Sequence, residues 1–230
     1  MNTDPLGQLF STAEAVLFDF DGPICSVFDG YPAKQISTEL RGLAKTIRDD
    51  LGDFLDKATS PHDLLLTAAS DPELAAQLER ALQRFELEAI ETASPTPGAA
   101  ESLTSCSESG KLVAIVSNNY AEAVASYLAR AGLIGRVQHI EGRDPVDPTL
   151  MKPSPHLLEN ATRALGVDTA SCVFVGDQTS DMEAGRTAGV RTVGYANKPG
   201  KADSLALAGA DVVVDTMTEV AAAIHRSRDR

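Results

Sequence analysis

The feature that most constrains the fold is a series of short apolar runs separated by segments with helical spacing. The runs cover residues 16–18, 112–116, 173–175 and 212–214, with a weaker run at 191–195. Apolar and polar residues do not alternate within the runs, which is typical of parallel strands covered by helices on both faces of the sheet. Helices are expected at residues 120–131, 155–165 and 181–188. This order predicts an α/β fold with a doubly wound parallel sheet.

A long segment after the first run has no strand pattern and is rich in helical spacing. Asp71 and Pro72 form a helix-capping and first-turn pair, and a stripe of apolar residues follows at Leu74, Leu78, Leu82, Phe85 and Ala89. Residues 32–51 are expected to form another helix, and the turn-rich residues 94–98 mark a boundary. We therefore predict a helical insertion at residues 23–94, carried by a core made of residues 1–22 and 95–230.

The size and the charge of the chain restrict its partners. The chain has 230 residues, of which 43% are hydrophobic, and can bury a sizeable core. Its formal net charge of −13 argues against a broad basic surface for nucleic acid or anionic lipid. A small ligand is expected instead. The protein itself is expected to be a monomer or a homodimer. If this ligand is anionic, the site must concentrate positive charge through a lysine, a metal ion or helix N-termini.

The cysteines and the N-terminal residues predict a cytoplasmic protein. Cys25, Cys106 and Cys172 are widely spaced and form no CxxC pair, so the sequence predicts neither a disulfide framework nor a zinc site. Residues 1–12 lack a basic region followed by an apolar core, and no stretch approaches the roughly 18 apolar residues of a membrane span. We expect a protein that is neither exported nor inserted into a membrane.

Polar clusters follow three of the apolar runs. They are Asp19-Phe20-Asp21-Gly22, Ser117-Asn118-Asn119, and a segment that begins with Asp177 and ends with Asp181. Because the carboxyl ends of parallel strands meet at one edge of a sheet, these clusters should converge. A single acidic residue after a strand usually caps the next helix, but four carboxylates and a serine at three strand ends indicate a site.

The clustered carboxylates predict a Mg²⁺ site. Carboxylates brought together raise one another's pKa unless a cation lies among them, and oxygen-only ligands suit Mg²⁺. Asp19 and Asp177 are the expected carboxylate ligands. Lys152, which precedes a helix in the segment Met151-Lys152-Pro153, is the candidate for additional positive charge.

The ordered set of motifs resembles the haloacid dehalogenase superfamily. The motifs are DxDG at 19–22, Ser-Asn at 117–118, Lys-Pro at 152–153 and GDxxxD at 176–181. The insertion after the first motif is similar to the C1-type helical cap of that family, and the whole chain looks like a phosphoglycolate phosphatase-like member. The resemblance implies a Rossmann-like core with the active site beneath the cap.

The resemblance also implies a role for each motif residue. Asp19 would be the nucleophile that forms an aspartyl-phosphate, and Asp21 would protonate the leaving alcohol and later activate water. Ser117 and the backbone amide of Asn118 would bind the phosphoryl oxygens. Lys152 would neutralise those oxygens and orient Asp19.

The implied function is a Mg²⁺-dependent phosphohydrolase that cleaves a small phosphorylated metabolite, such as phosphoglycolate or a sugar phosphate. The implied metal ligands are Asp19, the backbone carbonyl of Asp21, and Asp177. Asp181 would bind the metal through water or orient the other ligands.

Other functions stay open. Dehalogenases need neither a metal nor a second acid, so Asp21 and Asp177 favour phosphate chemistry. A sugar-phosphate mutase or a phosphonatase is an alternative, and the phosphonatase would form a Schiff base with a lysine of the insertion, for which Lys34, Lys45 and Lys57 are candidates. The alternative of another class is a non-catalytic module that binds phosphorylated metabolites, which would be expected to lack the nucleophile, the lysine or the metal aspartate.

Two features of the sequence bear on the choice of substrate. Pro23 stands where the family usually has threonine or valine, and because proline fixes φ and donates no hydrogen bond, the segment leading into the insertion can differ from the family pattern. Arg41, Lys45 and His62 are polar residues of the insertion and candidates to contact a second anionic group.

Overall fold

The central element is a six-stranded parallel sheet with the strand order β5-β4-β1-β6-β7-β8. A computed structural model describes residues 4–48, 55 and 58–229. The strands are β1 Ala15–Phe18, β4 Leu112–Val116, β5 His139–Glu141, β6 Cys172–Gly176, β7 Arg191–Tyr195 and β8 Val212–Val214. β1 pairs in parallel with β4 on one side and with β6 on the other. The predicted α/β fold with a Rossmann-like parallel sheet is confirmed.

Both faces of the sheet are buried, which explains why the apolar runs do not alternate. Val16, Phe18 and Ile115 belong to one hydrophobic cluster, whereas Leu17 and Phe174 belong to another on the opposite face. The first cluster receives residues from α1 Pro5–Ser11, α5 Ala99–Glu108, α6 Ala121–Arg130 and α10 Met217–Arg226. The second receives residues from α7 His156–Leu165 and α8 Thr179–Ala188, and α9 Lys201–Ala208 packs on α8 and β7.

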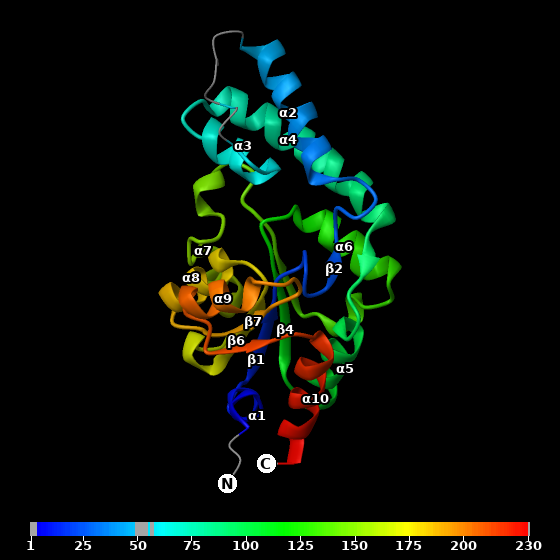
Figure 1. The fold of residues 1–230 in the computed structure, drawn as a ribbon, viewed down its shortest axis with the longest axis vertical. Helices are drawn as coiled ribbons and strands as arrows, with labels where there is room; N and C mark the ends of the chain where they lie inside the picture. The colour runs from blue at the N-terminus through cyan, green and yellow to red at the C-terminus, as the bar shows by residue number, and fades with distance from the viewer. Residues whose placement is uncertain (1–3, 49–54, 56–57, 230) are drawn as a thin grey trace.

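Three helices form a separate layer beyond the carboxyl ends of the strands (Figure 1). They are α2 Ala33–Ile47, α3 Pro61–Ala68 and α4 Pro72–Ala89, and they share a hydrophobic cluster of their own. The expected helix at 32–51 is observed over the bounds of α2, and its predicted residues 49–51 lie outside the described residues. A short antiparallel pair, β2 Cys25–Ser26 with β3 Ser94–Pro95, joins the two ends of this segment.

The start of α4 agrees with its sequence signals. The Asp71 side chain accepts a hydrogen bond from the Leu74 backbone N–H at 3.2 Å, and Pro72 occupies the first turn, where its missing N–H has no intrahelical partner to lose. Leu74, Leu78 and Leu82 are buried in the helical layer. Two carboxylates of the same helix, Glu79 and Glu86, are buried as well, and they matter for the site described below.

Several elements have no clear signal in the sequence. β5 is three residues long and half-buried, and the predictions also lack α9 and α10. All three cysteines are buried free thiols. Within residues 4–48, 55 and 58–229, no helix combines the length and the apolar character that a membrane crossing needs.

Candidate active site

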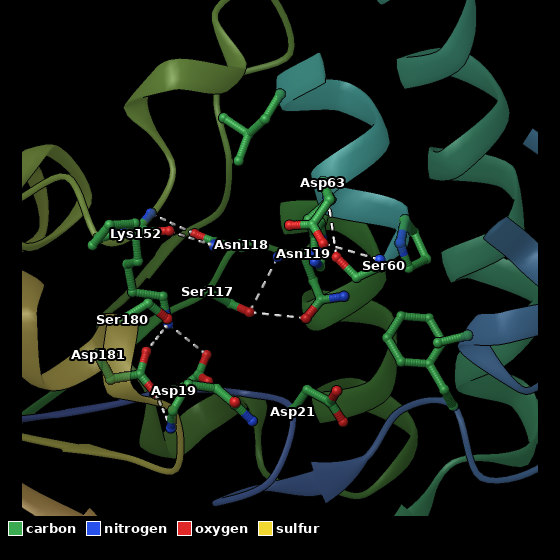
Figure 2. Close-up of a pocket in the computed structure, with 17 residues that line it drawn as sticks. Asp19, Asp21, Ser60, Asp63, Ser117, Asn118, Asn119, Lys152, Ser180 and Asp181 are labelled. Atoms are coloured by element: carbon green, nitrogen blue, oxygen red, sulfur yellow. Dashed lines mark hydrogen bonds and ion pairs between the residues drawn. The ribbon is translucent and has the colours of Figure 1, made fainter. Parts of the chain in front are cut away.

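The end of β1, the first turn of α8 and the segment before α7 bring three charged side chains together in the interior. The Lys152 ammonium lies 2.8 Å from Asp19 Oδ1 and 2.7 Å from Asp181 Oδ1. It also donates to the Val116 carbonyl at 3.1 Å, and the side chain is only 3% exposed. Figure 2 shows Lys152 reaching down between Asp19 and Asp181. Lys152, the candidate for additional positive charge, therefore lies between two carboxylates of this site.

Three buried carboxylates form a compact group that could hold a metal ion. One oxygen from each of Asp19, Asp177 and Asp181 lies within 4.8 Å of the others. Asp177 Oδ2 accepts hydrogen bonds from Gln178 at 3.1 Å and Asn197 at 3.0 Å. The Lys201 ammonium also contacts Asp177 Oδ2 and donates to the Asp177 carbonyl.

The other oxygen of Asp177 has the character expected of a metal ligand. Among the described residues, no donor contacts Asp177 Oδ1, although this atom is buried. A buried carboxylate oxygen without a donor is costly, and a cation beside it would offset that cost. Gly22 leaves the space for this arrangement, since its φ is +118° and a Cβ there would lie 2.6 Å from Asp177 Cγ.

The electrostatics of the cluster also favour a cation. Burial and the neighbouring carboxylates of Asp181 and Asp177, against the opposing effect of Lys152, raise the pKa of Asp19 to about 8. Burial by itself would lower the pKa of Lys152, but Asp181 and Asp19 raise it above its usual value. The three carboxylates exceed the two ammonium groups of Lys152 and Lys201 by one charge. An oxygen-only donor set of this kind fits a hard divalent cation.

The remaining predicted residues lie at the same cleft. Asp21 accepts a hydrogen bond from the Val27 backbone N–H at 2.9 Å, and its pKa is raised, chiefly by burial. The Asn118 side chain brackets the backbone of Lys152, accepting from the Lys152 N–H at 2.8 Å and donating to the Lys152 carbonyl at 3.1 Å. Ser117 is buried and donates its hydroxyl to Asn119 Oδ1 at 3.0 Å.

A cavity of about 450 Å³ opens from this cluster toward the helical layer. Its floor contains Asp19, Asp21, Ser117, Asn118, Lys152 and Asp181. Its opposite wall contains Phe28, Ala33, Ser60, Pro61, His62, Asp63 and Leu66. Ser60 and Asp63 form a reciprocal capping box at the start of α3, which fixes the turn that faces the floor (Figure 2).

Of the three polar residues named as candidates to contact a second anionic group, the structure places His62 in the cavity wall. Arg41 instead donates to the backbone carbonyls of Leu55 at 3.2 Å and Ala58 at 2.5 Å. Lys45 is exposed on α2 and does not line the cavity.

The match to a family spans most of the sheet and all four motifs. Residues 16–195 match the family described as haloacid dehalogenase-like hydrolase. The chain belongs to the haloacid dehalogenase-like hydrolases. The resemblance inferred from the motifs is thereby confirmed.

Individual relatives of this haloacid dehalogenase-like hydrolase are named phosphatases. N-acetylmuramic acid 6-phosphate phosphatase of Pseudomonas aeruginosa is 27% identical over 224 residues, which cover 93% of this chain and 96% of that protein. Phosphoglycolate phosphatase of Neisseria meningitidis is 29% identical over 191 residues, which cover 79% of each protein. The predicted enzyme class, a phosphatase of this family, is confirmed.

A solved structure shares the fold. CbbY from Rhodobacter sphaeroides, in complex with xylulose-1,5-bisphosphate, gives a TM-score of 0.67 at 19% sequence identity. The similarity covers 90% of this chain and 96% of that chain. At this identity the comparison supports the fold of the hydrolase and not its substrate.

The sequence predictions miss a buried polar network next to Ser117. Its members are Glu79 and Glu86 of α4, Asn119 after β4, and Arg143 after β5. Glu86 lies four residues after Leu82, and residues at this spacing share one face of a helix. A carboxylate on the apolar face of the predicted helix was therefore the sequence signal for a buried polar contact. Arg143 gives no comparable signal. Its side-chain partners, Glu79 and Glu86, are at least 57 residues away in the sequence, and its other contacts are with the backbone of Asn118 and Asn119.

Proposed function

We propose that this hydrolase is a Mg²⁺-dependent phosphatase that cleaves a small phosphate monoester through an aspartyl-phosphate on Asp19. The observation that carries the proposal is the way Asp19 is held. Its Oδ1 accepts a hydrogen bond from the Phe20 backbone N–H at 2.7 Å and forms an ion pair with the Lys152 ammonium at 2.8 Å. Among the described residues, no donor contacts Oδ2, so this oxygen is available to the phosphorus atom or to a metal.

The first step is attack of the Asp19 carboxylate on phosphorus. The bond between phosphorus and the leaving oxygen breaks, and Asp21 donates a proton to that oxygen, so an alcohol departs. The raised pKa of Asp21, caused chiefly by burial, supports its role as the acid. During this step, Lys152 and Ser117 stabilise the negative charge on the phosphoryl oxygens.

The second step releases phosphate. Asp21, now a carboxylate, takes a proton from water, whose oxygen attacks phosphorus and returns Asp19 to its carboxylate form. Asp19, Asp177 and the backbone carbonyl of Asp21 would hold Mg²⁺, and Asp181 would bind the ion through water or orient the other ligands. When bound, Mg²⁺ supplies positive charge to the phosphoryl oxygens as negative charge moves toward the leaving group.

The alternatives have less support. Of the lysines considered for a Schiff base, Lys34 and Lys45 do not line the cavity, and Lys57 lies outside the described residues. A mutase has no specific observation in its favour. A non-catalytic module would leave unexplained why the nucleophile, the acid, the lysine and the metal aspartate lie together.

We further propose that residues 23–94 form a cap that selects the substrate, over a core of residues 1–22 and 95–230. The cavity wall formed by α3 and Phe28 supports this division, because it faces the reacting groups from across the cleft. The named activities of the relatives, on N-acetylmuramic acid 6-phosphate and phosphoglycolate, support a phosphorylated sugar or hydroxy acid as the substrate.

Phosphate release from a panel of phosphorylated metabolites, with and without Mg²⁺, tests the proposal. The panel should include sugar phosphates, phosphoglycolate, an aryl phosphate and a phosphonate. We expect release from monoesters alone, its loss in excess chelator and its recovery with Mg²⁺. Full activity in chelator, or turnover of the phosphonate alone, would contradict the proposal.

A further inference from the structure

Glu86 is a fully buried carboxylate that α4 projects onto the turn after β4. Its side chain is 0% exposed and accepts hydrogen bonds from Asn119 Nδ2 at 2.8 Å and from the Tyr120 backbone N–H at 3.1 Å. Arg143, also 0% exposed, donates to both carboxylate oxygens at 2.8 and 2.7 Å. Glu86 is therefore well paired, because three residues donate hydrogen bonds to its two oxygens.

The charge of Glu86 is maintained despite its burial. Burial by itself would raise the pKa of Glu86, but Arg143 and His62 lower it below its usual value. The His62 ring lies 3.4 Å from Glu86 Oε1 and lines the cavity. An ionised carboxylate is a hydrogen-bond acceptor and never a donor. Whatever faces Glu86 must therefore present an N–H or O–H group.

This requirement decides the orientation of the Asn119 amide. Asn119 must turn its NH₂ group toward Glu86, so its Oδ1 points the other way, toward Ser117. The Ser117 hydroxyl donates to that oxygen at 3.0 Å, and the Asn119 backbone N–H donates to Ser117 Oγ at 3.2 Å. Ser117 Oγ is thus held by two contacts to one residue, and that residue is held by Glu86.

We infer that Glu86 is a positioning residue for Ser117, which it orients through Asn119 for contact with the phosphoryl group. Glu86 itself does not line the cavity and would not touch the substrate. The Ser117 hydroxyl can leave Asn119 and turn to a phosphoryl oxygen by rotation about its Cβ–Oγ bond, while the backbone contact keeps the oxygen in place. A residue of the helical layer thereby shapes the phosphate-binding turn of the core. The inference rests on the proposed function, which makes Ser117 a phosphate ligand.

Glu79 provides a matched control on the same helix. It is nearly as buried as Glu86, at 7% exposed, and also pairs with Arg143, at 2.7 Å. Its other oxygen accepts a hydrogen bond from the Gln83 side chain. Unlike Glu86, it makes no hydrogen bond to residues 117–119. Glu79→Gln and Glu86→Gln each remove one buried charge beside Arg143, but Glu86→Gln alone releases the constraint on Asn119.

The test is titration calorimetry of the whole protein with inorganic phosphate in the presence of Mg²⁺, with thermal unfolding measured in parallel. We expect the phosphate Kd to rise on the order of tenfold in Glu86→Gln, as for the loss of a charged hydrogen bond. In Glu79→Gln we expect a change of less than about twofold despite a similar fall in unfolding temperature. Asn119→Ala keeps Glu86 and Arg143 paired and should show the same loss of phosphate affinity. If Glu86→Gln does not fold, the phosphate Kd of Asn119→Ala tests the inference in its place.

Two results would overturn the inference. One is a phosphate Kd that stays at the wild-type value in folded Glu86→Gln or Asn119→Ala. The other is an equal loss in Glu79→Gln, which would assign the effect to the buried charge in general. A wild-type protein that binds no phosphate would instead contradict the proposed function, so the two failures can be told apart.

Discussion

The two aspartates of the first motif differ in what surrounds them. Both line the cavity, but Asp19 lies against Lys152 and two further carboxylates, whereas Asp21 accepts a hydrogen bond from the Val27 backbone N–H. Gly22 follows them and passes so close to Asp177 that its lack of a side chain is required. At the scale of single residues, the site therefore depends on Gly22, because a larger side chain there would clash with Asp177.

Gly22→Ala should weaken metal binding. The new Cβ would lie 2.6 Å from Asp177 Cγ, so either the carboxylate or the backbone at position 22 must shift, which disturbs the group formed by Asp19, Asp177 and Asp181. We expect the Mg²⁺ Kd, measured by titration calorimetry, to rise at least about tenfold, as is common when the surroundings of a metal ligand are disturbed.

Gly110→Ala is the control for backbone strain in this measurement. Gly110 also has a positive φ, +68°, but no atom lies within 4 Å of its virtual Cβ. Both alanines strain the backbone, by on the order of 1 to 3 kcal/mol, and the strain is larger at φ +118° than at φ +68°, but only the alanine at position 22 meets Asp177. An unchanged Mg²⁺ Kd in folded Gly22→Ala would contradict the assignment of Asp177 as a ligand.

At the scale of elements, α3 contributes most of the wall opposite the reacting groups. Its capping box holds Ser60 and Asp63 in place, and His62 extends from the first turn into the cavity. In the proposed mechanism the phosphoryl group would lie on the floor, so this wall would contact the leaving group of a bound ester. Changes on α3 should therefore alter which esters are cleaved more than the chemistry of cleavage.

His62→Ala should lower kcat/KM for sugar phosphates by about tenfold, the size expected for loss of one polar contact. An aryl phosphate, which departs with less need of contacts, should lose less. Steady-state kinetics on both substrates measures the difference, with Lys45→Ala as the control, because Lys45 is exposed and away from the cavity. Equal losses on both substrates would contradict a role for His62 in recognising the leaving group.

The sequence predicts the elements better than it predicts their contacts. Asp19, Ser117 and Asp177 could be placed together because each follows a buried run, and parallel strands end at a common edge. Glu86 and Arg143 could not be paired in advance, since they are 57 residues apart and no local pattern links them. Arg41 shows the same limit, because its side chain donates to carbonyls within the helical layer and does not line the cavity.

At the scale of the whole molecule, a chain with a net charge of −13 is proposed to bind an anionic substrate. The positive charge is local: Lys152 lies at the floor of the cavity and Lys201 lies behind Asp177. These two ammonium groups do not balance the three buried carboxylates of the cluster. This excess of negative charge favours the uptake of a proton or a cation by the folded protein.

This imbalance predicts a pH dependence of stability. Burial and its carboxylate neighbours raise the pKa of Asp19 to about 8 from 3.8, so the folded metal-free protein holds a proton that the unfolded chain has lost between these values. The stability that this proton contributes is fully present below about pH 4 and is lost as the pH rises through about 8.

Mg²⁺ and the proton should then compete for the same carboxylates. We expect Mg²⁺ to raise the unfolding temperature more at about pH 8 than at about pH 6. In Asp19→Asn the metal-free protein should show a weaker pH dependence over this range. Thermal unfolding with and without Mg²⁺ at the two pH values measures this, and an equal metal effect at both would contradict the charge imbalance.

The central claim is that Asp19 becomes covalently phosphorylated, and the Asp21→Asn variant tests it most directly. This variant keeps the nucleophile but lacks the acid and base, so turnover should fall by about 10² to 10⁴. An aryl phosphate needs little protonation to depart, so it should still phosphorylate Asp19, and the product should persist because no base activates water. Acid quench followed by peptide mass spectrometry should find the phosphoryl group on the peptide at Asp19, and none in Asp19→Asn. A phosphoryl group on any other residue, or turnover in Asp19→Asn comparable to wild type, would contradict the account.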